Sequence, residues 1–499
     1  MLEQRDQAQP PATGDGDRRR RLAALEAQIA RDLELIEAPL RPWVPATAGT
    51  DGAAIPDVVI VGAGLSGLSI AFGLKRQGVE RVLVLDAAEE ADEGPWLATA
   101  RMRTLRSPKT LTGPDLGIPS LTYRSWHEAV HGGESWAGLD KIDRHDWMDY
   151  LGWFRRVTGL SIENRTRVVG ISADGPYPVL RVERDGVVSD LHCRKLVLAT
   201  GIEGGGGLFV PQAVAAAIPP EKWTHSGQRF DTDTLRGKDV GVIGAASSSF
   251  DWAVNALGSG AASVTLLARS PDLPRTEVLD WSNFPGFLNH FADLDDTWRY
   301  RFARRLLGFK TPPTQEMYDA AHRFPNFRMV LGAPLLEASL QGEKVVLACG
   351  PAGSFAFDHL LLGTGYDIDL ARRPELGEIA PNIALWQDRF TPSAGESDEA
   401  LLKYPYLGPA FEFVERRPGE MPALRHIHLF NNGAVPSLGP VCNGITGLKA
   451  GVPKIVAGLT RALFIDDADT HYAALCGYRK QHFDPDAPRR AAPTPTRQE

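Results

Sequence analysis

Two stretches of the chain, residues 57–86 and 239–269, share one pattern of hydrophobic and polar positions. In each, a continuous run of mostly β-branched residues predicts a strand that is buried on both faces, as in parallel sheets. Small residues follow at once, and apolar positions then recur with helical spacing, which predicts a tight turn and a helix. A second apolar run closes each stretch. The pattern therefore predicts two strand–turn–helix–strand units in an α/β fold.

Glycines occupy the turn of the first unit at the spacing of a dinucleotide-binding site. Gly62 makes the tight turn, Gly64 lets the backbone approach a pyrophosphate, and Gly67 lets the helix pack closely on the strand. Asp86 ends the second strand, where a carboxylate accepts hydrogen bonds from a ribose. A glycine-rich turn in some other βαβ unit is the alternative. Strand, helix, spacing and acid together favour the dinucleotide site.

The turn of the second unit is less rich in glycine. It keeps Gly244, but Ala246 and Ser249 replace the second and third glycines. Both are small, so a phosphate-binding turn is still expected here, with less room than glycine gives. Arg269 stands where the first unit has its acid, and a guanidinium there suits a 2′-phosphate. The second unit therefore predicts NADPH rather than NADH, with a plain surface arginine as the alternative.

Two further apolar strands, 195–201 and 358–366, end in Thr-Gly. Such ends place backbone N–H groups beside a ligand, so we expect Thr200, Gly201 and Gly365 to contact a cofactor. The order of the motifs predicts two Rossmann-like dinucleotide-binding domains, with the NADPH domain inserted into the FAD domain. The predicted division is an extension and linker (1–54), an FAD domain (55–221), an NADPH domain (222–350), the rest of the FAD domain (351–483) and a disordered tail (484–499).

Composition narrows the classes of partner. The 499 residues carry 54 Lys and Arg against 62 Asp and Glu, a formal net charge of −8, so no general field attracts nucleic acid or an anionic membrane. The most apolar stretch, 58–74, is too short and too rich in glycine for a membrane span. Four scattered cysteines without a Cys-x-x-Cys pair argue against a dithiol centre or a cysteine-rich metal site. We expect a cytoplasmic protein with a small-molecule substrate.

A family likeness rests on six short motifs between residues 57 and 366. Four are the two turns and the two Thr-Gly strand ends, and the others are Gly94-Pro-Trp96 and His225-Ser226. In this order they resemble the class B flavoprotein monooxygenases, which include the flavin-containing, Baeyer–Villiger and N-hydroxylating ornithine/lysine types. The Phe and Gly positions that surround the His-Ser pair in that family are missing here. Taken alone, His225 would be an ordinary linker histidine.

The resemblance implies a shared chemistry. NADPH reduces FAD, O₂ adds at the flavin C4a position, and one oxygen atom is transferred to a small molecule while the other leaves as water. The protein binds and orients the cofactors and excludes solvent. By the same resemblance Trp96 belongs to the FAD site, and His225 and Ser226 belong with Gly244 and Ser249 in the NADPH site.

The type of monooxygenase follows from looser matches. Arg103 stands where Baeyer–Villiger enzymes have an acid, and the stretch 105–109 lacks the Asn of the flavin-containing type. The N-hydroxylating type fits better, with Arg106, an aromatic helix at 144–153, and an Asn443-Gly-Ile-Thr-Gly-Leu stretch. By this resemblance Arg106 and Asn443 are the catalytic candidates.

The basic segment, residues 101–109, carries Arg101, Arg103, Arg106 and Lys109. We expect it to hold an anionic substrate or developing charge on the flavin, with a solvated basic loop as the alternative. N-hydroxylation of an amine is the leading expectation. The alternatives are Baeyer–Villiger or S-oxygenation, a non-oxygenating NADPH:acceptor flavin reductase, and a module that only binds cofactors.

Overall fold

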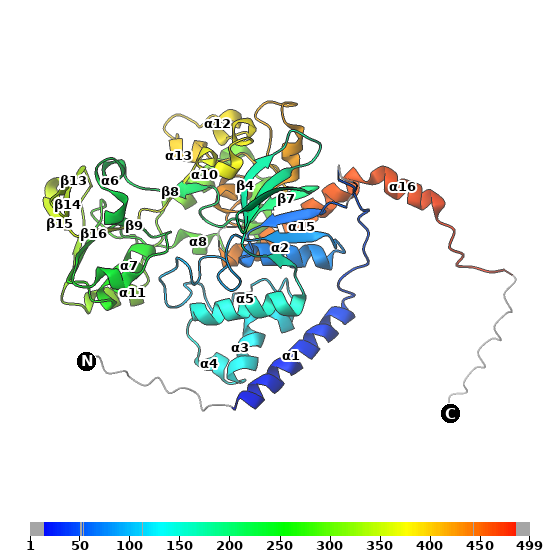
Figure 1. The fold of residues 1–499 in the computed structure, drawn as a ribbon, viewed down its shortest axis with the longest axis horizontal. Coiled ribbons are helices and arrows are strands. Elements are labelled where there is room, and N and C mark those ends of the chain that lie inside the picture. Colours follow the sequence, from blue (N-terminus) through cyan, green and yellow to red (C-terminus); the bar gives the residue numbers. More distant parts are fainter. Residues whose placement is uncertain (1–13, 50–51, 53, 112, 443, 486–499) are drawn as a thin grey trace.

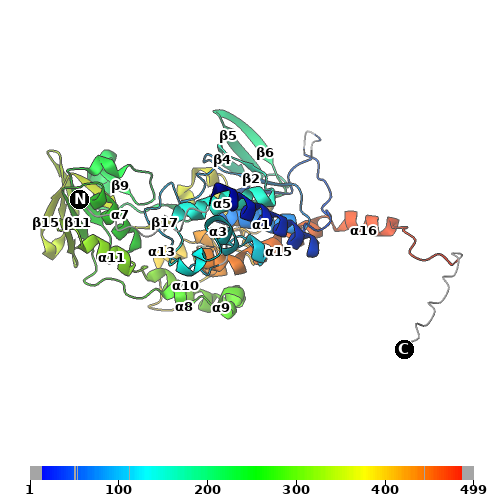
Figure 2. The same cartoon turned by 90° about the horizontal axis from the view of Figure 1, so that it is seen from below.

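The computed structural model describes residues 14–49, 52, 54–111, 113–442 and 444–485. Asn443 and residues 486–499 of the predicted tail lie outside this part of the chain. Helix α1 (Asp15–Leu35) packs along one side of the body, and α16 (Ala468–Gly477) projects from it, as Figures 1 and 2 show. No helix among the described residues is both long and apolar enough to cross a membrane.

The first sheet has five parallel strands in the order β18-β7-β1-β2-β3. Helix α2 (Leu65–Arg76) connects the two strands of the first predicted unit, and α15 (Leu448–Asp466) packs against α2. The strands are β1 (Val58–Val61), β2 (Val82–Leu85), β3 (Ile162–Glu163), β7 (Lys195–Leu198) and β18 (Ile427–Leu429).

The second sheet also has five parallel strands, in the order β12-β11-β10-β16-β9. Helix α7 (Ser247–Gly258) follows the second turn. The strands are β9 (Trp223–His225), β10 (Asp239–Ile243), β11 (Ser263–Leu267), β12 (Phe327–Val330) and β16 (His359–Leu362).

The two sheets confirm the predicted fold class. All strands of the second sheet lie between residues 223 and 362, whereas the first sheet resumes with β18 at 427. The unit with the second sheet is therefore inserted into the unit with the first. Figure 1 shows the inserted unit to one side of the body. The predicted limit of the NADPH domain at 350 falls before β16, which pairs with β10 and β9.

Helices α3 (Tyr123–His131), α4 (Ser135–Gly138) and α5 (Arg144–Thr158) form a layer between α1 and the first sheet (Figure 1). The aromatic face of α5 is packing, because Trp147, Tyr150 and Phe154 are at most 1% exposed. Asp143 caps α5 through the backbone N–H of His145, and Gly159 ends it in the left-handed region at φ +58°.

The remaining elements flank the two sheets. The strands are β4 (Thr166–Ser172), β5 (Val179–Arg184), β6 (Val187–His192), β8 (Gly206–Leu208), β13 (Glu337–Gln341), β14 (Lys344–Ala348), β15 (Ser354–Phe357) and β17 (Tyr366–Ile368). The helices are α6 (Gln212–Ala217), α8 (Val278–Trp281), α9 (Pro285–His290), α10 (Asp296–Gly308), α11 (Gln315–His322), α12 (Trp386–Arg389), α13 (Glu399–Leu402) and α14 (Val435–Leu438).

Candidate active site

The turn after β1 has the geometry that its glycines predict. Gly62 has φ +106°, and a Cβ there would lie 2.4 Å from the carbonyl oxygen of Ala199, the residue that follows β7. A Cβ at Gly67 would lie 1.8 Å from the carbonyl oxygen of Gly62. Both positions therefore require glycine for the fold itself.

Gly64 differs from the other two glycines. A Cβ there would meet nothing closer than the Cα of Gly94, at 3.6 Å, so the space beside it is open. Gly64 also caps α2, and no side chain among the described residues accepts a hydrogen bond from the first turn of this helix. The helix N-terminus therefore offers its N–H groups to a phosphate. We call this turn, from Gly62 to Gly67, the cradle, and its open space fits the pyrophosphate of a dinucleotide.

Asp86 lies against the same turn. Its Oδ2 accepts a hydrogen bond from the backbone N–H of Ala63 at 2.7 Å, and its Oδ1 accepts one from Ala88 at 2.8 Å. These bonds fix the carboxylate at the end of β2, beside the cradle. Contact with a ribose stays a prediction for this residue.

Trp96 packs edge-on against Trp147 of α5, with ring centroids 6.0 Å apart. The indole N–H groups of both residues are buried and have no hydrogen-bond partner among the described residues. An unsatisfied buried donor indicates a missing acceptor, and a flavin nucleotide supplies several. Gly94 joins this residue to the cradle, since its Cα faces Gly64.

A small cavity of about 60 Å³ opens beside Gly64, and Glu93 lines it. Glu93 is 6% exposed and accepts hydrogen bonds from Arg155 and Asn164 at 3.0 and 2.7 Å. Sequence reasoning missed this acid, although its place directly before Gly94 was a usable signal. A larger cavity of about 540 Å³ lies between α2 and α15, at the opposite end of α2 from the cradle.

The Thr-Gly strand ends follow β7 and β16, where the chain leaves one sheet on its way to the other. Thr200 accepts a hydrogen bond from the side-chain amide of Asn431 at 3.1 Å, and Gly201 has φ +70°. Gly365 has φ +87° and leads into β17, which pairs with β8. These residues therefore lie in the two chain connections between the sheets. Contact with a cofactor stays a prediction for all of them.

The turn after β10 repeats the geometry of the first. Gly244 has φ +118°, and a Cβ there would lie 2.5 Å from the carbonyl oxygen of Gly363. Ser249 takes the third glycine's place and is fully buried, with its Oγ 3.5 Å from that same oxygen. Among the described residues no side chain caps α7. The turn thus keeps the shape of a phosphate-binding turn, and binding of NADPH there stays a prediction.

His225 ends β9 and is fully buried. Its Nδ1 accepts a hydrogen bond from the N–H of Gly227 at 3.0 Å, and burial lowers the pKa of the ring to about 4. The neutral ring therefore carries its proton on Nε2, which faces the backbone of Gly365 without a hydrogen bond of suitable geometry. Tyr366 packs edge-on against this ring at 5.7 Å. Ser226 donates its backbone N–H to Leu362.

Comparisons with known proteins identify the family. A profile described as pyridine nucleotide-disulphide oxidoreductase matches residues 59–281. The chain is 38% identical to the FAD-dependent urate hydroxylase of Xanthomonas campestris pv. campestris over 462 residues, which covers 93% of this chain and 97% of that protein. The chain belongs to the class B flavoprotein monooxygenases. This membership confirms the predicted FAD-dependent monooxygenase, and NADPH as its reductant stays a prediction.

Two solved structures share the fold, and a further relative matches part of the sequence. The ornithine N-hydroxylase of Kutzneria sp. 744 matches with a TM-score of 0.65 and 18% identity, over 82% of this chain and 99% of that one. The ornithine hydroxylase of Pseudomonas aeruginosa matches with a TM-score of 0.64 and 16% identity, over 82% and 100%. The FAD-containing monooxygenase EthA of Mycolicibacterium smegmatis is 25% identical over 54% of this chain and 52% of its own length.

In this monooxygenase the basic segment lies against the inserted unit. Arg106 forms an ion pair with Asp251 of α7, a residue 3% exposed. Burial raises the pKa of Asp251, and the charge of Arg106 opposes that rise. Arg101 donates a hydrogen bond to the carbonyl of Phe230 at 2.8 Å and lies over the Trp252 ring at 4.8 Å. The sequence analysis did not predict Asp251 as the partner of Arg106. The signal it offers is an acidic residue within an otherwise apolar helix.

The other two cations of the segment differ from each other. Lys109 donates hydrogen bonds to the carbonyls of Trp136 and Leu139. Arg103 is exposed, and its guanidinium makes no hydrogen bond or ion pair within the described part of the chain. Catalytic roles for Arg106 and Asn443 stay predictions, the second for a residue outside the described ranges.

Proposed function

We propose that this monooxygenase hydroxylates urate or a closely related purine anion, using FAD, NADPH and O₂. The observation that carries the proposal is the 38% identity to the urate hydroxylase, because it extends over 97% of that protein. A match over 93% of this chain includes both strand–turn–helix–strand units and the segments between and after them. Fold alone would leave the substrate open.

FAD supplies the oxygen chemistry when it is bound and reduced, and the chain supplies binding, orientation and dryness. The cradle around Gly64 and the N-terminus of α2 would hold the pyrophosphate. The buried N–H of Trp96 would donate to the flavin nucleotide. The turn at Gly244, with the N-terminus of α7, would hold the pyrophosphate of NADPH.

The proposed reaction balances without a further reductant. One NADPH, one proton and one O₂ are consumed, one oxygen atom becomes a hydroxyl group on the substrate, and NADP⁺ and water are released. Urate is a planar anion at neutral pH, and a planar guanidinium binds such a group through paired hydrogen bonds. Among the described residues, Arg103 is the arginine of the basic segment whose guanidinium has no hydrogen-bond or ion-pair partner.

N-hydroxylation of an amine is the second candidate. It is favoured by structural neighbours that hydroxylate ornithine, lysine or cadaverine, at TM-scores of 0.59 to 0.65. At identities of 14–18% the likeness supports a shared fold and not a shared substrate, so N-hydroxylation of an amine ranks below hydroxylation of urate.

The test uses purified, FAD-loaded protein with NADPH in air. We expect urate to stimulate NADPH oxidation by about tenfold or more over the basal rate, with a product heavier by one oxygen. Xanthine, which has the same ring system with one carbonyl fewer, is the matched control and should stimulate little. Stimulation by ornithine or lysine, with oxygen found on nitrogen, would replace urate by the second candidate. Turnover that requires an electron acceptor would indicate a reductase.

The ion pair between Arg106 and Asp251 gives a separate prediction. Arg106→Ala should raise the KM for NADPH and slow flavin reduction about fivefold, because a half-exposed pair contributes about 1 kcal/mol to the placement of α7. Asp251→Asn should give the same change. Stopped-flow reduction is measured beside the KM for substrate. A higher substrate KM with normal reduction would instead support the substrate role that the sequence predicts for Arg106.

A further inference from the structure

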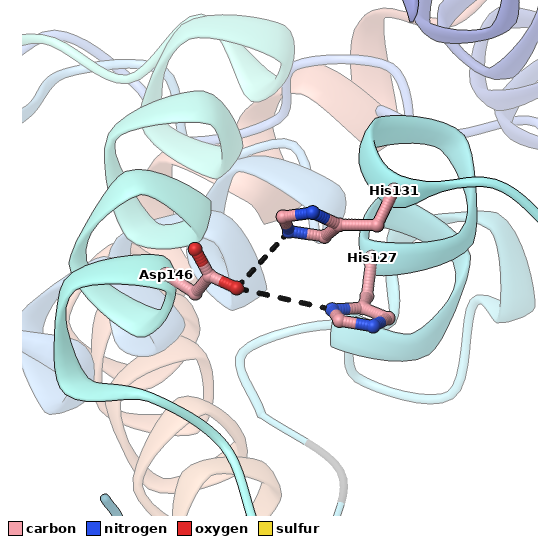
Figure 3. Close-up of side chains that lie close together, drawn as sticks. All are labelled: His127, His131 and Asp146. Atoms are coloured by element: carbon pink, nitrogen blue, oxygen red, sulfur yellow. Dashed lines mark ion pairs between the residues drawn. The ribbon is translucent and has the colours of Figure 1, made fainter. Parts of the chain in front are cut away.

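A cluster of three ligand-type side chains lies in the helical layer, on elements to which the proposed function assigns no role. His127 and His131 stand one turn apart on α3, and Asp146 lies opposite them on α5. Figure 3 shows both imidazole rings turned toward the same carboxylate. One nitrogen or oxygen atom from each of the three lies within 4.8 Å of the others.

The spacing of these atoms fits a small cation. Nε2 of His131 lies 3.0 Å from Oδ2 of Asp146, and Nδ1 of His127 lies 4.0 Å from the same oxygen. A tetrahedral zinc ion with bonds of about 2.0–2.1 Å holds its ligand atoms roughly 3.3 Å apart. The two distances to Asp146 lie on either side of this value, and the two histidine nitrogens lie within 4.8 Å of each other, so a bound ion would draw the three side chains slightly together.

Hydrogen bonding within the cluster is incomplete. Nε2 of His131 is buried and, although close to Asp146, makes no hydrogen bond of suitable direction among the described residues. Nδ1 of His127 has only a long contact of 3.3 Å with the hydroxyl of Tyr123. A buried nitrogen without a directed partner indicates a missing one, and a metal ion accepts its lone pair.

We propose that His127, His131 and Asp146 form a binding site for a divalent cation of the zinc type, which links α3 to α5. Two imidazole nitrogens and one carboxylate oxygen are ligands that zinc prefers, and water completes the tetrahedron. The link would stiffen α5 one residue before Trp147, whose ring packs against Trp96. This inference does not depend on the identity of the substrate.

The experiment uses tag-free, FAD-loaded, full-length protein that has been treated with a chelator. Zinc chloride is titrated by calorimetry, and cobalt chloride is titrated while absorption is followed at wavelengths beyond the flavin bands. We expect one saturable zinc site and a tetrahedral cobalt spectrum. Asp146→Asn and His131→Gln should each weaken binding by more than about tenfold, since loss of an outer partner alone costs 10–100-fold.

The matched control is the exposed pair His290 and Asp293, 3.2 Å apart, which no third ligand joins among the described residues. His290→Gln should leave zinc binding unchanged. Zinc should raise the Tm of wild type and of this control but not of Asp146→Asn, each compared with its own Tm in the absence of metal. Absence of a saturable site in wild type, or binding that survives both cluster variants, would overturn the proposal and leave a plain His–Asp ion pair.

Discussion

Gly64→Val is expected to yield a folded protein that has lost FAD. The Cβ at this position meets only the Cα of Gly94 at 3.6 Å, an ordinary contact, and Gly64 has φ −68° and ψ −174°, which any residue adopts. The new side chain would instead fill the open space of the cradle, where the backbone must approach a pyrophosphate. Flavin absorbance per chain should fall to near zero, while the circular dichroism stays that of wild type.

Two further variants frame this result. Gly138→Val places the same side chain where no atom lies within 4 Å, and it should keep its flavin. Gly62→Val should fail to fold, because its Cβ would lie 2.4 Å from a backbone oxygen at φ +106°. The Tm of Gly64→Val should equal that of wild type stripped of FAD, since only ligand stabilisation is lost. A yellow, fully loaded Gly64→Val protein would disprove the assignment of this cradle.

Arg269→Ala should raise the KM for NADPH by roughly 10- to 150-fold, with little change for NADH, because a charge-assisted contact contributes about 1.5–3 kcal/mol. Arg269 is exposed and lies two residues after the end of β11, and this strand pairs with β10, which leads into the Gly244 turn. A 2′-phosphate on a nucleotide held at that turn would lie within reach of such a residue. Steady-state kinetics with both nucleotides measure the ratio.

Arg275→Ala is the control, because it removes an exposed arginine from the same loop that is already paired with Asp272. It should leave the preference for NADPH unchanged. If Arg269→Ala also leaves that preference unchanged, another residue binds the 2′-phosphate, and the assignment of Arg269 is wrong.

The parts of the site that the sequence predicted are local. Gly62 and Gly67 lie within one turn and its helix, so their spacing alone encodes the close approach that the structure shows. Ser249 stands at the third glycine position of the second turn and is fully buried there, so this position accepts a small side chain without loss of the turn. Short-range geometry of this kind leaves a direct trace in the order of residues.

The parts that the sequence did not predict join distant segments. Arg106 and Asp251 are 145 positions apart, and nothing near either residue indicates the other. Strand β16 pairs with β10 and β9, which come more than a hundred residues earlier in the chain, and no local pattern indicates such a long-range pairing. His127, His131 and Asp146 meet because two helices pack, and helix packing leaves no fixed spacing between them.

The insertion also orders events during synthesis. Every strand of the second sheet has left the ribosome soon after residue 362, so this unit can fold while the remainder of the chain is being made. The first sheet began earlier but must wait for β18, and until then the outer edge of β7 is unpaired. The half of the enzyme that starts first is therefore completed last, and its open edge is where a nascent or truncated chain is most exposed to aggregation.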